Sequence, residues 1–193
     1  MSAVPDLRSV FLDLEMRLEA EPEGVTGEIV RGVYSMTPRP RARHGGVQGR
    51  LFAALHPRLG SGEGSAPPEW LFVIEPELRS LRNFTRVVPD LAGWKRSGSG
   101  WPDLDVTPLS HMPDWVAEVL SPSTAAFVSE ERSGAYGAMG VGWLWLVDAD
   151  LRRVETFENV RGQMVARAVF EAGASVAGEP FAPVSIPSSE LFL

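Results

Sequence analysis

The sequence contains no cysteine among its 193 residues. Without thiols, the chain can form no disulfide, no thiolate metal site and no cysteine nucleophile. A metal ion would have to be held by carboxylate, imidazole or water ligands, and this set of ligands favours hard cations.

Long apolar runs are missing as well. No stretch of about 18 consecutive apolar residues exists, and the first 24 residues lack the basic start, apolar middle and cleavage site of a signal peptide. We therefore expect a soluble, cytoplasmic protein with no membrane partner. The length is sufficient for one well-buried core and short for two, so we predict a single domain over residues 1–193.

The chain has no overall excess of basic charge, because its formal net charge is −7. This excludes a protein that coats nucleic acid non-specifically. The arginines are nevertheless clustered in two stretches: Arg39, Arg41, Arg43 and Arg50 in the first, and Arg79, Arg82 and Arg86 in the second. Either these arginines form a basic patch on an acidic body, or they are solvated residues that flank loops and a helix.

Hydrophobic periodicity predicts alternating helices and strands. We expect helices over 4–20, 43–59 and 125–139, and strands over 28–36, 70–78, 85–94, 114–120 and 143–150, followed by two more exposed strands over 152–159 and 164–171. No internal repeat is present. This order favours the α/β class, as an α+β mixed sheet covered by helices.

Two acids lie where apolar side chains would be less costly. Asp90 directly follows Pro89 at the end of a predicted strand, and Glu118 interrupts the apolar run "WVAEVL". A buried carboxylate is protonated, paired or bound to a cation. If the two acids converge, a divalent cation would satisfy both and could activate water against a phosphodiester.

Five stretches carry a resemblance to a known family: "GEIVRG", "PRPRARHGGVQGRL", "VVPDLAGW", "PDWVAEVLSPSTA" and "YGAMGVGWLWLVDAD". In this order, over residues 24–160, the chain resembles the Uma family of restriction-endonuclease-like proteins in the PD-(D/E)XK nuclease superfamily. The resemblance implies a restriction-endonuclease-like core of helix, three strands, helix and strand. It also implies metal-dependent hydrolysis of nucleic acid, with DNA the favoured substrate.

The resemblance assigns roles by position. Asp90 and Glu118 match the two motif acids that would bind Mg²⁺ or Mn²⁺. Glu28 takes the place of the family's glutamate near the first strand, and His44 and Gln48 match polar residues at the start of the next helix. The family's lysine, four residues before a tyrosine, is Arg132 here, and an aspartate of the family is Val128.

Arg132 shares its predicted helix face with Ala135, Tyr136 and Met139, so we expect it to point toward the sheet. An inward arginine needs anions, and Glu118 is the nearest candidate along the chain. Because a guanidinium can clamp carboxylates, Arg132 would compete with a metal ion for Glu118.

Each candidate also has a structural interpretation. Asp90 could begin a turn, Glu118 could be a buried acid paired with an arginine, Glu28 could start a strand, and His44 could be a capping group. We interpret Glu75 as decoration of an edge strand, Asp148 as the start of a turn, and the tryptophans as core residues rather than base-stacking groups.

Two functions therefore stay open. The first is a metal-dependent nuclease, and the alternative is a non-catalytic module that keeps the nuclease fold to bind nucleic acid or a protein. By analogy with dimeric endonucleases, we also expect a homodimer.

Overall fold

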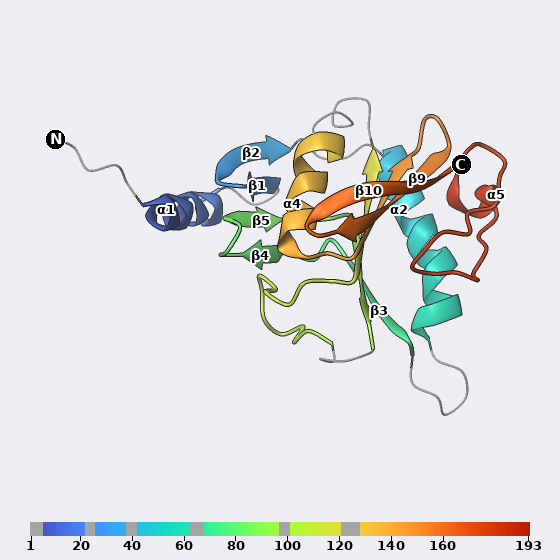
Figure 1. Cartoon of the computed structure of the whole chain (residues 1–193), viewed down its shortest axis with the longest axis horizontal. Helices are drawn as coiled ribbons and strands as arrows, with labels where there is room; N and C mark the ends of the chain where they lie inside the picture. Colours follow the sequence, from blue (N-terminus) through green and yellow to red (C-terminus); the bar gives the residue numbers. More distant parts are fainter. Residues whose placement is uncertain (1–5, 22–25, 38–41, 62–67, 97–100, 121–127) are drawn as a thin grey trace.

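The computed structural model describes residues 6–21, 26–37, 42–61, 68–96, 101–120 and 128–193. Within them the chain forms two β-sheets and four α-helices (Figure 1). The four-stranded sheet has the order β2-β1-β5-β4 and is antiparallel. The six-stranded sheet has the order β10-β9-β8-β7-β6-β3 and is mixed, since β7 and β8 pair in parallel and its other neighbouring strands pair antiparallel. The predicted mixed α/β class is confirmed.

The elements have the following bounds. The helices are α1 (Leu7–Glu19), α2 (Ala42–Leu55), α4 (Ser133–Met139) and α5 (Ser188–Leu191), with π-helical turns at His56–Gly60 and Val128–Arg132. The strands are β1 (Thr26–Val30), β2 (Val33–Thr37), β3 (Trp70–Ile74), β4 (Leu78–Ser80), β5 (Thr85–Val87), β6 (Leu91–Lys95), β7 (Trp115–Leu120), β8 (Trp143–Asp148), β9 (Arg153–Val160) and β10 (Gln163–Phe170).

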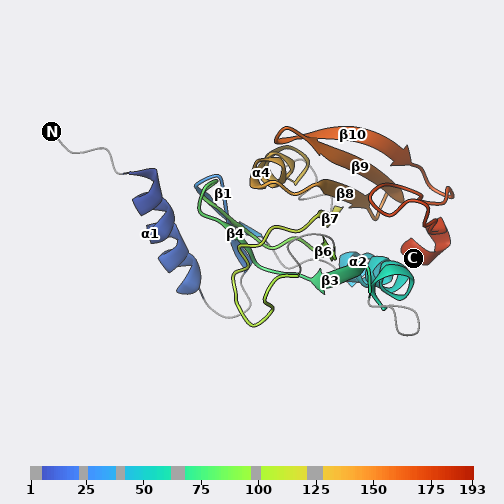
Figure 2. The ribbon, with the colours of Figure 1, turned by 60° about the horizontal axis from the view of Figure 1, so that its bottom comes forward.

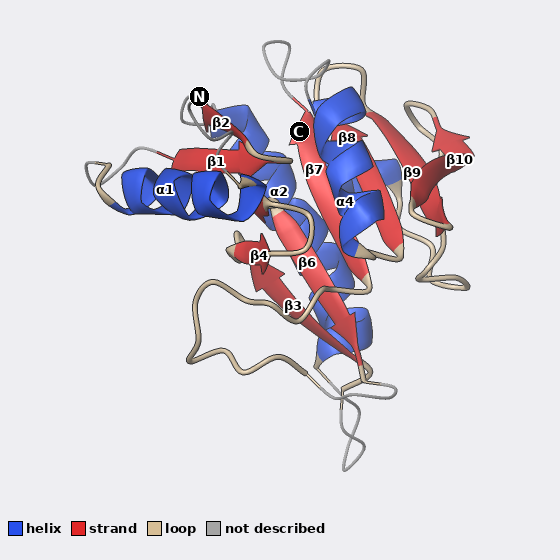
Figure 3. Ribbon diagram, turned by 60° about the vertical axis from the view of Figure 1, so that its left-hand side comes forward, coloured by secondary structure: helices blue, strands red, loops and turns tan. Residues whose placement is uncertain are grey.

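The two faces of the six-stranded sheet are covered by different helices (Figures 2 and 3). Successive side chains of a strand point to opposite faces. On β7, Trp115, Ala117 and Val119 accordingly pack in the cluster that includes α2 and the C-terminal segment, whereas Val116 packs in the cluster that includes α4. Glu118 has the same parity as Val116, so it faces α4.

Four of the six tryptophans form core, as predicted, whereas Trp143 is partly buried and Trp101 is 36% exposed. Trp70, Trp94, Trp115 and Trp145 are at most 2% exposed. The rings of Trp115 and Trp145 meet edge to face at 5.7 Å, and Phe181 of the C-terminal segment packs against both. Aromatic side chains of this size dominate core burial, so the C-terminal segment completes one face of the sheet.

The predicted strand over 28–36 was wrong: this segment is a hairpin of β1 and β2. Arg31 and Gly32 both have positive φ, 51° and 80°, which is the type I′ pattern of a two-residue hairpin turn. The same dipeptide, Arg161 and Gly162, turns β9 into β10. Apolar residues lie on both sides of Arg31 and Gly32 in "EIVRGVYSM", so the segment resembles one continuous strand.

The predicted strands over 70–78 and 85–94 are each broken beside a proline. The chain leaves the six-stranded sheet between β3 and β4 and returns to it between β5 and β6. Pro76 and Pro89 lie in these two crossings, and a proline cannot donate a ladder hydrogen bond. The crossings lie side by side, since the N–H of Glu75 donates to the carbonyl oxygen of Asp90 at 3.1 Å.

The second arginine cluster is largely paired with acids. Arg79 donates two hydrogen bonds of 2.6 Å to Glu15 of α1, and Arg86 contacts Glu77 and Glu19. These contacts attach α1 to the four-stranded sheet. In the first cluster, Arg43 pairs with Asp150 at 3.2 Å, while Arg39 and Arg41 lie outside the described residues.

The other helices follow the prediction in part. The described portion of the predicted helix over 125–139 begins at Val128, and residues 121–127 lie outside the described residues. The helix ends at Gly140, whose φ of 91° gives the left-handed C-cap typical of glycine. No helix within the described residues is long and apolar enough to cross a membrane.

Candidate functional site

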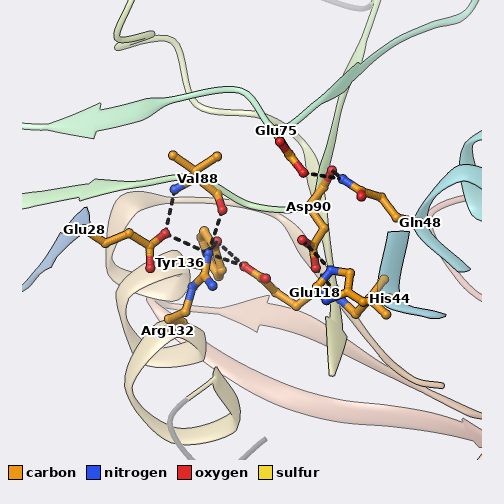
Figure 4. Close-up of polar contacts among 10 residues, drawn as sticks. Glu28, His44, Gln48, Glu75, Val88, Asp90, Glu118, Arg132 and Tyr136 are labelled. Carbon is orange, nitrogen blue, oxygen red and sulfur yellow. Dashed lines mark hydrogen bonds and ion pairs between the residues drawn. The ribbon is translucent and has the colours of Figure 1, made fainter. Parts of the chain in front are cut away.

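The predicted site residues gather where β6 begins and β7 ends (Figure 4). Antiparallel pairing of β6 with β7 places Leu91 opposite Ala117, so Asp90 and Glu118 are neighbours on adjacent strands. Helix α2 contributes His44 and Gln48 to one side of this point. Strand β1 contributes Glu28 to the other side, and Arg132 lies at the end of the π-helical turn that precedes α4.

On the α2 side, Asp90 is held by three different groups. Its Oδ2 accepts a 2.6 Å hydrogen bond from the N–H of Val119, and its Oδ1 lies 2.8 Å from Nε2 of His44. Its backbone oxygen accepts a 2.8 Å hydrogen bond from Nε2 of Gln48. The Asp90 carboxylate is thus fixed in position, with 13% of its side chain exposed.

On the α4 side, Glu118 lies in a buried polar network. Tyr136 donates a hydrogen bond to Oε1 of Glu118, and Nη2 of Arg132 lies 2.9 Å from the same oxygen. Glu118 is 2% exposed and Arg132 is 6% exposed. The predicted inward orientation of Arg132 and its pairing with Glu118 are therefore confirmed.

Glu28 connects this network to the backbone of the β5–β6 crossing. Its Oε1 accepts hydrogen bonds from the N–H of Val88 at 2.8 Å and from Nη2 of Arg132 at 3.0 Å. The same Arg132 nitrogen donates to the carbonyl oxygen of Val88 at 2.8 Å. Glu28 and Arg132 together satisfy a backbone segment that belongs to neither sheet.

Burial controls the charge states of this network. Burial raises the pKa of the Glu118 carboxyl to about 8; Arg132 opposes the rise, and Asp90 adds to it. Burial also raises the pKa of Tyr136 well above its usual range, so the phenol remains a hydrogen-bond donor. For Arg132, burial acts to lower the pKa, but Glu118 and the other neighbours raise it well above the ordinary value, so the guanidinium stays charged.

Two contributors were missed in the sequence. Tyr136 served only to mark the position of Arg132, although its hydroxyl contacts both Glu118 and Arg132. Glu75 is not decoration of an edge strand: it lies in the β3–β4 crossing, and its Oε1 accepts a 3.2 Å hydrogen bond from Gln48. Its φ of 49° is uncommon for a residue other than glycine. Glu75 precedes Pro76, which was the available signal of a break.

The Asp90 half of the site could hold a divalent cation. Nε2 of His44 is buried and makes no aligned hydrogen bond, although Oδ1 of Asp90 lies 2.8 Å away. Adjacent ligands of an octahedral ion with bonds of about 2.1 Å are roughly 3 Å apart, so both atoms could bind one cation. The Glu118 half is occupied by Arg132, and among the described residues no three His, Asp or Glu side chains are grouped to hold a metal.

Comparison with known proteins places the chain in context. A search of curated proteins found no match. Among solved structures, the chain is similar to a crystal structure of a "putative nuclease belonging to DUF820" from Anabaena variabilis, with a TM-score of 0.68 and 19% identity. The match covers 92% of this chain and 96% of that one, which shows a shared fold.

A family model matches residues 10–188, and these residues include all six predicted site positions. Its description is Uma2, "Putative restriction endonuclease". The predicted resemblance is confirmed, and this chain belongs to the Uma2 family.

Proposed function

We propose that this chain hydrolyses phosphodiester bonds of nucleic acid, with DNA the favoured substrate, in a reaction that requires Mg²⁺ or Mn²⁺. The observation that carries the proposal is the position of Asp90 next to Glu118 at the boundary of β6 and β7, with His44 and Gln48 beside them. Membership of a nuclease family and a nuclease-like fold support it.

Asp90 and Glu118 are the residues that would hold the cation. When bound, it would polarise the scissile phosphate and lower the pKa of a water molecule. Gln48 and the N–H of Glu75 hold the backbone oxygen of Asp90, and Val119 holds its Oδ2, so the carboxylate is oriented before any ligand arrives. Such preorganisation is what a catalytic carboxylate requires.

Arg132 has two roles in this proposal. Its permanent positive charge lies beside Glu118, where charge developing on a phosphate could be stabilised. It cannot act as a proton donor or acceptor, because a guanidinium does not lose its proton in proteins. By occupying Glu118, it also weakens the binding of a cation there.

The second candidate function is a non-catalytic module that binds nucleic acid or a protein. The observation in its favour is that Oε1 of Glu118 is already bound by Arg132 and Tyr136. A site of this kind would bind a cation through Asp90 without cleaving nucleic acid.

A titration followed by a cleavage assay separates the two functions. We expect calorimetry to detect Mn²⁺ binding to the wild type, and Asp90→Asn to weaken it at least tenfold, because loss of a ligand charge removes about 1.4 kcal/mol or more. The matched control is Asp114→Asn, since Asp114 also accepts a strand N–H, from Lys95, but lies at the opposite end of the β6–β7 pair.

Cleavage of linear and circular DNA is then measured on the same samples. Mn²⁺-dependent cleavage that Asp90→Asn abolishes and Asp114→Asn retains supports the nuclease. Mn²⁺ binding without cleavage of DNA or RNA supports the module. If Asp90→Asn and Asp114→Asn bind Mn²⁺ as well as the wild type, the assignment of Asp90 is wrong.

A further inference from the structure

One nitrogen atom of Arg132 lies among four oxygen atoms. Nη2 is 2.8 Å from the carbonyl oxygen of Val88, 2.9 Å from Oε1 of Glu118, 3.0 Å from Oε1 of Glu28 and 3.2 Å from the hydroxyl of Tyr136. We call these four atoms the oxygen cage. They come from β1, the β5–β6 crossing, β7 and α4, so four separate parts of the chain meet at one nitrogen (Figure 4).

The cage contains more acceptors than this nitrogen can serve. A guanidinium NH₂ group has two hydrogens, and here four oxygens surround it. The contacts with Glu28 and Glu118 are ion pairs, and those with Glu28, Val88 and Tyr136 are hydrogen bonds, so the two hydrogens are shared among several acceptors. The oxygens are therefore gathered around a positive centre rather than matched one to one with its hydrogens, as oxygen ligands are around a metal ion.

The chemistry of the cage is also that of a cation site. Two carboxyl groups, a backbone carbonyl and a hydroxyl are all oxygen ligands of the kind that hard cations take. Glu28 and Glu118 are each 2% exposed, and Tyr136 is 0% exposed. Oε2 of Glu28 and Nε of Arg132 are buried and have no hydrogen-bond partner among the described residues, so the guanidinium does not satisfy every polar atom around it.

We propose that Arg132 is a tethered cation that fills a cation-binding cage formed by Glu28, Val88, Glu118 and Tyr136. The guanidinium and a free divalent ion exclude each other from this cage. The proposal does not depend on hydrolysis, and it concerns the Glu28 side of Glu118 rather than the Asp90 side.

The experiment removes the guanidinium and offers a free cation. Arg132→Ala leaves the two carboxyl groups without their cation, and breaking a buried pair in this way should lower the Tm by roughly 10 °C in chelator. Ca²⁺ is the probe because it accepts irregular sets of oxygen ligands at about 2.3–2.6 Å. The measurement is made at about pH 8.5, because metal binding releases protons from its carboxyl ligands and is therefore favoured at higher pH.

We expect Ca²⁺ at about 100 times its Kd to raise the Tm of Arg132→Ala by roughly 5 °C or more. In Arg132→Ala/Glu28→Gln, which loses a cage ligand, this gain should be absent. In Arg132→Ala/Asp90→Asn, the gain should remain, since Asp90 belongs to the proposed catalytic cation site and not to the cage. Failure of the cage and failure of the proposed function are thereby distinguished.

Three further variants serve as controls. Arg79→Ala breaks another ion pair, with Glu15 of α1, and should lower the Tm without recovery by Ca²⁺. Arg132→Lys keeps a positive charge in the cage and should retain more of the wild-type Tm than Arg132→Met, which has similar length and no charge.

Three results would overturn the proposal. The first is a folded Arg132→Ala whose Tm does not respond to Ca²⁺, and the second is an equal response in the Glu28→Gln double variant. The third concerns an Arg132→Ala variant that does not fold in chelator, for which we expect circular dichroism to show folding on addition of Ca²⁺. If the variant stays unfolded in Ca²⁺, and if Arg132→Lys and Arg132→Met are equally stable, the arginine fills space and does not act as a cation.

Discussion

At the scale of single residues, Glu118 is a carboxyl group that is almost completely buried. Its pKa is raised to about 8 from an ordinary value of 4.5, chiefly by burial. Between about pH 4.5 and about pH 8, the carboxyl is therefore protonated in the folded state, whereas the unfolded chain has released this proton. The stabilising contribution of the protonated carboxyl is complete below about pH 4.5 and is lost as the pH rises to about 8.

We predict that Glu118→Gln removes this dependence. Glutamine keeps an acceptor for Tyr136 and carries no charge to bury. Measured by urea denaturation, the unfolding free energy of Glu118→Gln minus that of the wild type should rise by a few kcal/mol between about pH 5 and about pH 8. Glu158→Gln is the control, because Glu158 lies on β9, is partly exposed and pairs with Arg167. An unchanged difference between wild type and Glu118→Gln at the two pH values would show that Glu118 is ionised throughout.

At the scale of elements, α4 packs closely against the β9–β10 hairpin because Gly137 has no side chain. A Cβ atom there would lie 2.6 Å from the carbonyl oxygen of Gly162, which is backbone and cannot move aside. Asn159 of β9 reinforces this contact by donating to the carbonyl oxygens of Gly137 and Val141. The position of α4, and with it that of Tyr136, depends on this close approach.

We predict that Gly137→Ala lowers the unfolding free energy by about 1–3 kcal/mol, the usual cost of overpacking. Gly134→Ala, in the same helix, is the matched control. Its Cβ would meet no atom nearer than Nη1 of Arg31 at 3.8 Å, so it should raise stability by about 0.5–1 kcal/mol through helix propensity alone. Urea denaturation of both variants tests the prediction, and equal effects would mean that the hairpin yields to α4.

At the scale of the whole molecule, we predict that the chain forms a homodimer. The basis of this prediction is the analogy with dimeric endonucleases together with exposed apolar residues. Val33 is 66% exposed and Met36 is 54% exposed, and both lie on β2, an edge strand of the four-stranded sheet. An edge strand can pair with a second copy.

Light scattering should give twice the 21.0 kDa mass of one chain at micromolar concentration. Val33→Glu should shift the mass toward that of the monomer by placing charge on the edge strand, whereas Leu151→Glu, at an exposed turn, should not. A wild-type mass of one chain across this range would show that the protein is a monomer. An unaltered dimer in Val33→Glu would place the interface elsewhere.

The sequence by itself determined the features that arise from local periodicity. Helical spacing located α1, α2 and α4, and the apolar runs around Trp115 and Trp145 identified two core strands. The turn at Asp148 was also predicted, and its Oδ1 accepts the N–H groups of Asp150 and Leu151. The motif resemblance supplied all six candidate positions, because the spacing of a motif along the chain is visible without the fold.

Only the tertiary structure decided which groups these residues satisfy. At Glu75, and again at residues 88–90, the chain crosses from one sheet to the other. The backbone groups of the second crossing are bound by side chains that are distant in sequence, those of Glu28, Gln48 and Arg132. Within the oxygen cage, Glu28 likewise contacts Arg132, which lies 104 residues away in the sequence. Apart from the pairing of Arg132 with Glu118, the local pattern did not predict these contacts, because long-range contacts arise from how the two sheets and α4 pack together.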